Sequence, residues 1–240
     1  MTVGLNRPGW RLALYPEAGE AGGSFRGLRR DCRGGFFEAD PDRSVNEATR
    51  RARAKVRRYC VANGLNRLGT LTYRGVGCHE PGQLRADLGQ FFRRLRSGVD
   101  EALPYLWVPE WHAGGHGLHA HFAVGQFVRR GLIDQAWGHG FTHIKLLGNL
   151  PVGSGVRGEA RAAAGYISKY LSKDMDRSDG LNRYDVAQGF QPKSEGLFAP
   201  TESEVVALAV ERMGEPPAYI WRSVNEERWL GPSAVWLQWR

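Results

Sequence analysis

The spacing of apolar residues predicts a run of short elements in the middle of the chain. Between residues 83 and 99 apolar residues recur every three or four positions, which predicts an amphipathic helix. Its expected buried side carries Leu84, Leu88, Phe91, Phe92 and Leu95. Strands are predicted at 68–73, 104–112, 117–125 and 141–147, and further helices at 129–137 and 158–173.

The order of these elements predicts the fold class. They run strand–helix–strand–strand–helix–strand, with one more helix at the end. This is the order of a ferredoxin-like or RRM-like α+β fold, in which an antiparallel sheet carries two crossover helices on one face. The remaining helix, which bears two tyrosines, is expected on the opposite, active face of the sheet.

The flanks of this pattern suggest three segments. Residues 1–43 are expected to form an N-terminal arm, 44–175 the core, and 176–240 a C-terminal extension that packs on the core. Ser44 and Glu47 are expected to form a capping box at the start of an Arg-rich helix. The arm has strand-like pieces at 10–15 and 34–39, and the extension has a capped helix at 201–213 and four tryptophans, Trp221, Trp229, Trp236 and Trp239, which are expected to pack the tail onto the core.

Alternation along the predicted hairpin separates an apolar face from a polar one. A turn at Gly114-Gly115 places Glu110 opposite His119 and Val108 opposite His121. Glu110, His112, His119 and His121 then share one face. Glu110, His119 and His121 form a set of two imidazoles and a carboxylate, which suits Mn²⁺ or Mg²⁺ bound together with a phosphate. Ordinary surface histidines near a turn are the alternative.

The segment 164–173, AGYISKYLSK, carries a second group of reactive side chains. Tyr166 and Tyr170 are four residues apart, so one helix would present both phenols on the same side. Lys169 and Lys173 each follow a tyrosine by three residues. A tyrosine oxygen is a nucleophile once a nearby cation favours its ionised form. Interfacial tyrosines on a basic helix are the alternative.

Composition adds a polyanion as the expected partner. The chain has 240 residues, of which 33 are Lys or Arg and 25 are Asp or Glu, giving a net charge of +8. Such a balance favours nucleic acid as the partner. Three cysteines without CxxC spacing argue against a disulfide framework and a structural zinc site, and suggest a reducing cytoplasm. We expect no membrane span and no secretory signal.

Three motifs in order resemble those of the HUH endonucleases, and among these the rolling-circle replication initiators of plasmids and phages. LGTLTY at 68–73 resembles the first motif, a strand that bears threonine. LHAHFAV at 118–124 resembles the second, with two histidines around a hydrophobic residue. YISKYLSK at 166–173 resembles the third, a tyrosine helix with its lysine. The resemblance covers residues 67–173.

The resemblance implies a metal-dependent nickase of single-stranded DNA. His119, His121 and Glu110 would hold the cation, and a tyrosine would attack the phosphate to leave a 5′-phosphotyrosine and a free 3′-OH. Tyr166, Tyr170 and Lys169 are the implied catalytic residues; which tyrosine attacks first is open, although the offset of Lys169 favours Tyr166. DNA contacts are expected from Lys173, Arg74 and His112.

The resemblance also implies the partners of such an initiator and its rivals. The expected partners are a replication origin and the helicase and polymerase of a bacterial host, in whose cytoplasm the protein would act. No G-x-x-x-x-G-K-[ST] motif is present, so unwinding is expected from the partner helicase. The alternatives are an HUH transposase or relaxase, an H-x-H-x-H nucleotide hydrolase, and a non-catalytic RRM-like binding module. Ala123, where the relaxases and these hydrolases have a further histidine, disfavours both.

Overall fold

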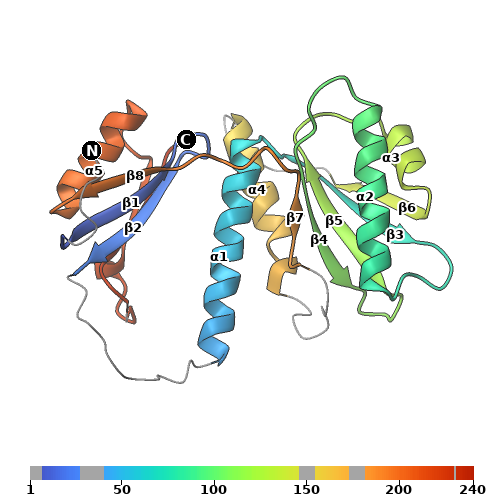
Figure 1. Cartoon of the computed structure of the whole chain (residues 1–240), viewed down its shortest axis with the longest axis horizontal. Helices are drawn as coiled ribbons and strands as arrows, with labels where there is room; N and C mark the ends of the chain where they lie inside the picture. Colours follow the sequence, from blue (N-terminus) through green and yellow to red (C-terminus); the bar gives the residue numbers. More distant parts are fainter. Residues whose placement is uncertain (1–6, 28–40, 146–154, 173–181, 230) are drawn as a thin grey trace. The chain divides into compact units, whose positions relative to one another are not determined.

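A computed structural model describes residues 7–27, 41–145, 155–172, 182–229 and 231–240. The chain forms two compact units, which we name the central unit, residues 42–191, and the terminal unit, residues 1–41 with 192–240. Each unit contains one five-stranded antiparallel sheet and its own hydrophobic core (Figure 1). The predicted α+β class is therefore confirmed.

The central sheet has the strand order β6-β3-β5-β4-β7, and all neighbouring strands are antiparallel. Its strands are β3 (Arg67–Tyr73), β4 (Tyr105–Trp111), β5 (Leu118–Val124), β6 (Gly140–Lys145) and β7 (Asp185–Val186). The helices of this unit are α1 (Pro41–Ala62), α2 (Pro81–Ser97), α3 (Arg130–Trp137) and α4 (Gly155–Ile167), followed by the 3₁₀ helix η1 (Tyr170–Ser172). The order from β3 to β6 is the ferredoxin-like order that the pattern predicts.

One face of the central sheet is covered by the crossover helices α2 and α3 (Figure 1). The predicted stripe of α2 is buried in full, with Phe91 and Phe92 in edge contact with Phe122 of β5. The inward strand residues of this face include Leu71, Trp107, Leu118 and Ala120. Burial of this many apolar side chains is what fixes the sheet against α2 and α3.

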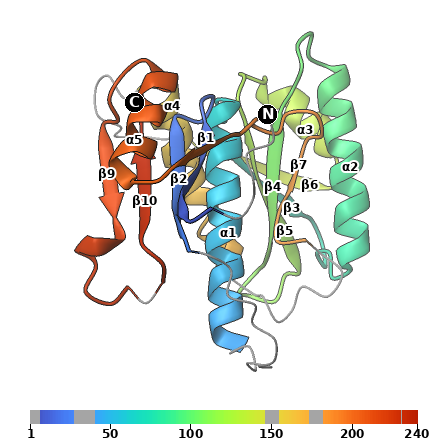
Figure 2. The same cartoon turned by 60° about the vertical axis from the view of Figure 1, so that its left-hand side comes forward.

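The opposite face of the central sheet changes character along its strands. At one end Leu68, Leu106 and Ala123 pack under apolar residues of α1 and α4. Farther along β3 and β5 the same face presents Thr70, His121 and His119 instead of aliphatic side chains. The strands lie between α1 and α2, as Figure 2 shows. Alternation therefore gives one sheet a continuous apolar face and a second face that is polar over part of its length.

Two helix boundaries differ from the sequence prediction. Helix α1 begins at Pro41, so Ser44 and Glu47 lie inside it rather than at its cap. Proline is favoured at the first helical position because an N–H there would have no hydrogen-bond partner within the helix, and proline has no N–H. Helix α4 ends at Ile167 rather than at 173, and Tyr170 lies in η1. The turn tightens because the N–H of Lys169 bonds to Tyr166 and that of Leu171 to Ser168, a 3₁₀ pattern.

Both flanks of the chain contribute to the sheet of the terminal unit, which has the strand order β8-β1-β2-β10-β9. Its elements are β1 (Gly9–Tyr15), β2 (Glu20–Arg26), β8 (Glu195–Ala199), α5 (Glu202–Met213), β9 (Tyr219–Arg222), η3 (Ser223–Asn225) and β10 (Ala234–Gln238). The predicted arm and extension thus share one sheet: β1 pairs with β8, and β2 pairs with β10. The strand-like piece at 34–39 lies outside the described residues.

The core of the terminal unit lies between its sheet and α5. Helix α5 starts with the predicted capping box, in which Thr201 and Glu204 exchange side-chain and backbone hydrogen bonds. Trp239 is fully buried in this core, whereas Trp221 and Trp229 contact each other edge to face. The tail tryptophans therefore include a core residue of the terminal unit itself.

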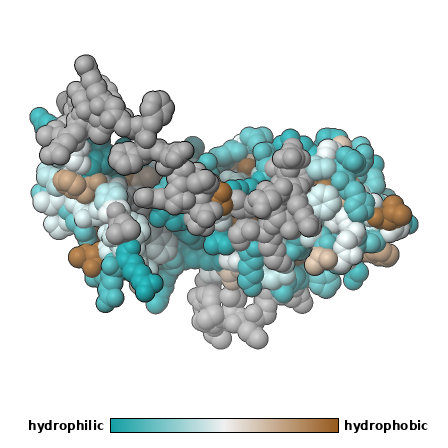
Figure 3. Space-filling model, turned by 90° about the horizontal axis from the view of Figure 1, so that it is seen from below, coloured by the Kyte–Doolittle hydropathy of each residue, from teal (hydrophilic) through white to brown (hydrophobic). Residues whose placement is uncertain are grey.

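The surface is mostly hydrophilic, with isolated hydrophobic residues on the face shown in Figure 3. The exposed large apolar residues come from separate parts of the chain and include Val76, Phe127, Phe141 and Val224. None of the described helices has both the length and the apolar character that a bilayer span requires.

Candidate active site

The polar part of the central sheet brings together four strands at one place. The register pairs Glu110 with His119 and Val108 with His121, as the hairpin analysis predicts. Strand β3 lies on the other side of β5, where Thr70 pairs with His121. Strand β6 follows, with His143 opposite Thr70. The side chains of this polar face thus come from β4, β5, β3 and β6 in spatial order.

His121 is held from both of its ring nitrogens. Its Nδ1 atom lies 3.0 Å from the Thr70 hydroxyl, and its Nε2 atom lies 2.6 Å from the Glu110 carboxylate. The side chain is only 10% exposed. A histidine fixed through both nitrogens has one ring orientation, which is a requirement for a positioned ligand or base.

His119 has one engaged nitrogen and one without a partner. Its Nδ1 atom lies 3.4 Å from the Thr72 hydroxyl, and its ring stacks on that of His112 with 4.7 Å between centroids. Its Nε2 atom is buried and has no hydrogen-bond partner within the described ranges. Burial, and then the neighbouring His112 and His121, lower the pKa of His119 to about 4. At neutral pH the imidazole is therefore uncharged and able to donate a lone pair.

The two candidate tyrosines meet each other and the histidine face. The Tyr170 hydroxyl donates a hydrogen bond to the Tyr166 hydroxyl over 3.0 Å. The Tyr170 ring stacks on His121 at 3.7 Å between centroids, with 13° between the planes. Burial, the hydrogen bond to Tyr166 and the nearby Glu110 charge raise the pKa of Tyr170. Tyr170 therefore stays protonated and donates this hydrogen bond, which the Tyr166 oxygen accepts.

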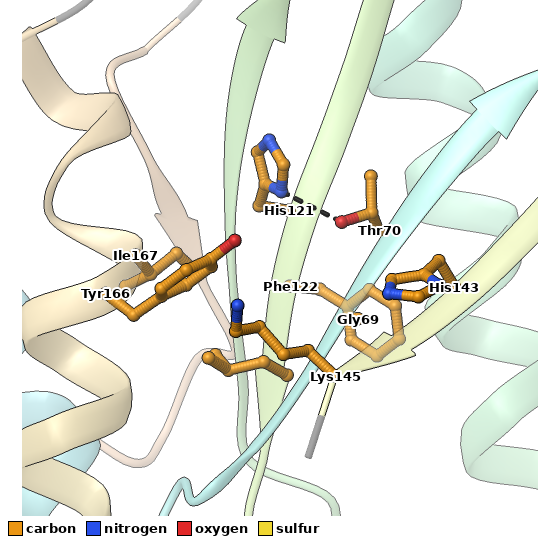
Figure 4. Close-up of a pocket in the computed structure, with 9 residues that line it drawn as sticks. Gly69, Thr70, His121, Phe122, His143, Lys145, Tyr166 and Ile167 are labelled. Carbon is orange, nitrogen blue, oxygen red and sulfur yellow. Dashed lines mark hydrogen bonds between the residues drawn. The ribbon is translucent and has the colours of Figure 1, made fainter. Parts of the chain in front are cut away.

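Two lysines lie beside Tyr166. The Lys145 ammonium nitrogen is 4.3 Å from the centre of the Tyr166 ring, and the Lys169 nitrogen is 5.3 Å from it. Lys145, Tyr166, His121 and Thr70 line a small pocket of about 60 Å³. Figure 4 shows the Lys145 nitrogen and the Tyr166 hydroxyl directed toward the same space.

Lys145 and His143 are site residues that the sequence analysis did not single out. The strand 141–147 is predicted, but its alternation also carries a signal. Every second residue from Phe141 through His143 to Lys145 lies on the face of Thr70, whereas Ile144 packs against the opposite core. A histidine and a lysine at alternate positions of a strand next to a threonine strand could have been assigned to that face.

Of the remaining predicted DNA contacts, His112 and Arg74 fall within the described residues. His112 follows β4 and stacks on His119, while its own Nδ1 accepts from the Gly114 N–H at 3.1 Å. Arg74 directly follows β3 and is exposed, with its backbone N–H bonded to His139. Lys173 lies outside the described residues.

The three predicted metal ligands lie on one face, but they do not form a closed metal site. In the described part of the chain, no three His, Cys, Asp or Glu side chains are placed to hold one ion. Glu110 and His121 pair directly at 2.6 Å, whereas two ligands each about 2.1 Å from one ion stand about 3 Å or more apart. The donor chemistry does fit a cation, because the Nε2 atom of His119 is buried without a partner. Binding would require the Glu110–His121 pair to open.

A comparison with protein-family models gives a match that falls on this site. Residues 66–175 match the family model of the replication-associated protein ORF2. The match covers less than half of the chain, but it contains Glu110, both histidines and both tyrosines. No curated protein and no solved structure matches the chain. Over these residues the chain is similar to a replication-associated protein, which is consistent with a replication initiator.

Proposed function

We propose that the protein is a rolling-circle replication initiator that nicks single-stranded DNA and becomes joined to it through a 5′-phosphotyrosine. The observation that carries this proposal is the contact of two phenols with the histidine face: Tyr170 stacks on His121 and donates to Tyr166. A non-catalytic binding module does not require a nucleophile, an uncharged imidazole and a carboxylate on one face. The replication-associated match supports the same function.

Tyr166 is the first nucleophile in this proposal. Its oxygen attacks the scissile phosphorus, the bond from phosphorus to the 3′-oxygen breaks, and the new ester joins tyrosine to the 5′ side. The phenolic proton passes to solvent, and the departing 3′-oxygen takes up one proton, so charge and atoms balance. Tyr170 stays protonated, and its hydrogen bond stabilises the negative charge that the Tyr166 oxygen gains when it loses its proton before attack.

Glu110, His119 and His121 would hold Mn²⁺ or Mg²⁺ in this proposal. When bound, such a cation polarises the phosphate and stabilises its developing charge. Thr70 and Thr72 orient the two imidazoles through their Nδ1 atoms. Oriented ligands matter because loss of such an outer hydrogen bond commonly costs about 10–100-fold in metal affinity or activity.

The products define the partners of the reaction. The free 3′-OH would prime a host polymerase, and a host helicase would separate the strands. The second phenol would permit a later strand transfer that ends the round. These steps agree with the resemblance to the HUH endonucleases.

The test is capture of single-stranded DNA in a covalent complex. A pool of oligonucleotides with a randomised centre and a 3′ label is incubated with the full chain and Mn²⁺ or Mg²⁺. We expect a labelled band that survives denaturing electrophoresis, disappears with chelator, and disappears in the Tyr166→Phe, Tyr170→Phe double variant. The single variants assign the first attack: Tyr166→Phe should lose at least about 100-fold in rate, and Tyr170→Phe about 10-fold, the value of one hydrogen bond.

Two results would overturn the nicking function. One is the absence of any covalent complex with either metal across the whole pool. The other is a complex that persists in the double variant.

A further inference from the structure

We infer that Lys145, at the end of β6, forms with Tyr166 a phosphate subsite that receives the scissile phosphodiester. The inference rests on the proposed nicking function and adds to it the residue that neutralises the substrate phosphate. Nothing in the three motifs points to β6, because Lys145 comes from a strand that none of them includes.

The position of Lys145 follows from the sheet. Lys145 pairs with Leu68 on β3, two residues before Thr70, so its side chain rises from the same face as the histidines. The ammonium nitrogen lies 4.3 Å from the Tyr166 ring centre and lines the pocket that also contains His121 and Thr70. In Figure 4 this nitrogen and the Tyr166 hydroxyl face the same space. A phosphate attacked by Tyr166 would have to enter that space.

The charge of Lys145 is available to a ligand. Among the described residues no carboxylate pairs with this ammonium group, and its contact is the face of an uncharged ring. Such a contact with an aromatic face is weak at an exposed site, about 0.5–1 kcal/mol. A phosphate oxygen offers a charge-assisted hydrogen bond, which is stronger. The Lys145 ammonium group thus lies near the Tyr166 nucleophile, and among the described residues no carboxylate neutralises its charge.

Lys145 suits this role better than Lys169, the lysine of the tyrosine motif. Lys169 is farther from the Tyr166 ring, at 5.3 Å, and lies beyond the last residue of α4. Lys145 is also a pocket-lining residue, whereas Lys169 is not among the side chains that line this pocket. The two cations therefore approach Tyr166 from different elements, and only Lys145 lies on the same sheet face as His121 and Thr70.

The experiment compares four variants on one oligonucleotide, the sequence that the wild-type chain captures fastest from the randomised pool. The variants are Lys145→Met, Lys145→Arg, Lys169→Met and, as a control on an exposed position of α1, Lys55→Met. The rate of covalent capture is measured at saturating DNA, and the dissociation constant is measured by fluorescence anisotropy in the Tyr166→Phe, Tyr170→Phe background. Melting temperature confirms folding.

We expect Lys145→Met to lower the capture rate by about 100-fold, with less than a threefold change in the dissociation constant, because the charge acts mainly on the reacting phosphate. Lys145→Arg should recover at least a tenth of the wild-type rate, since it keeps the charge. Lys169→Met should lose less than tenfold, and Lys55→Met should stay within threefold.

The subsite is wrong if Lys145→Met captures DNA within threefold of the wild-type rate, or if Lys169→Met alone shows the large loss. In both cases the wild-type chain still forms the covalent complex, so the nicking function stands. If the wild-type chain forms none, the nicking function fails first and the subsite fails with it. A Lys145→Met chain that does not fold is replaced by Lys145→Gln, judged by the same limits.

Discussion

The two faces of the central sheet use the same strands for different purposes. Along β5, Ala120 and Phe122 point into the core under α2 and α3, whereas His119 and His121 point to the opposite side. Along β3, Leu71 and Thr70 divide in the same way. Residues one position apart in the sequence therefore face the hydrophobic core and the candidate site, respectively. A face that carries the site can accept polar residues because the other face provides most of the packing.

The largest expected difference between the two faces is in the free energy of unfolding when adjacent residues of β5 are substituted. Phe122→Ala should reduce the free energy of unfolding by about 3–5 kcal/mol, because a buried ring that touches Phe91 and Phe92 is lost. His121→Gln should reduce it by less than about 1.5 kcal/mol, since the partner Glu110 keeps 18% of its side chain exposed to water.

Denaturant unfolding and covalent DNA capture measure these two effects on the same samples. The capture rate of the His121→Gln variant should be at least about 100-fold below that of the wild-type chain, although the variant remains folded. If His121→Gln destabilises the chain as much as Phe122→Ala does, the two faces do not differ in their contribution to stability.

An intermediate effect is expected at Thr70 of β3. Thr70→Val keeps the shape of the side chain but removes the hydroxyl that meets Nδ1 of His121. The capture rate should fall by about 10–100-fold, because the imidazole loses the bond that orients it. Unfolding free energy should change by about 1 kcal/mol or less. A capture rate equal to that of the wild-type chain would show that Thr70 does not orient His121.

The smallest expected effect is the pH dependence contributed by His119. Its folded pKa of about 4 lies below the ordinary value of 6.5, so the folded chain binds its proton less readily than the unfolded chain does. The stabilising contribution is therefore complete above pH 6.5 and is lost as the pH falls from 6.5 toward 4. For this half-buried side chain we expect a loss on the order of 1–2 kcal/mol.

Urea unfolding at several pH values between about 4 and 7 measures this loss, with His119→Gln as the matched variant. The variant should show a flatter pH dependence over that range. Equal slopes for the two chains would contradict the role of His119 in acid sensitivity.

Periodicity was sufficient to predict four of the five strands of the central sheet, all except β7, and the sheet face shared by Glu110, His119 and His121. The two-residue repeat of β4 and β5 predicts their register and the shared face of Glu110 and His119, because strand side chains alternate without exception in a regular hairpin. The end of α4 was not predictable in the same way. Local propensity favours a longer helix there, but the 3₁₀ turn carries Tyr170, whose ring stacks on His121.

Contacts between segments that are far apart in the sequence could not be predicted either. Lys145 reaches Tyr166 through the sheet and not through any sequence spacing, so no local motif reports it. The pairing of β1 with β8 joins segments that lie far apart in the chain, and β2 was not predicted at all. Its Gly22-Gly23 centre lacks the β-branched and aromatic residues that usually mark a strand. Glycine is needed at position 23 because the neighbouring strand β1 lies close: a Cβ on Gly23 would collide with the Arg11 carbonyl oxygen.

The sheet of the terminal unit has a consequence for the order of events during synthesis. Strands β1 and β2 leave the ribosome early, but β8 begins only at Glu195 and β10 at Ala234. The entire central unit is therefore translated before β1 and β2 can find their partners, and it contains all the strands of its own sheet. Because pairing between distant segments is slow, a β1–β2 hairpin that formed early would keep both of its edges unpaired until β8 and β10 are synthesised.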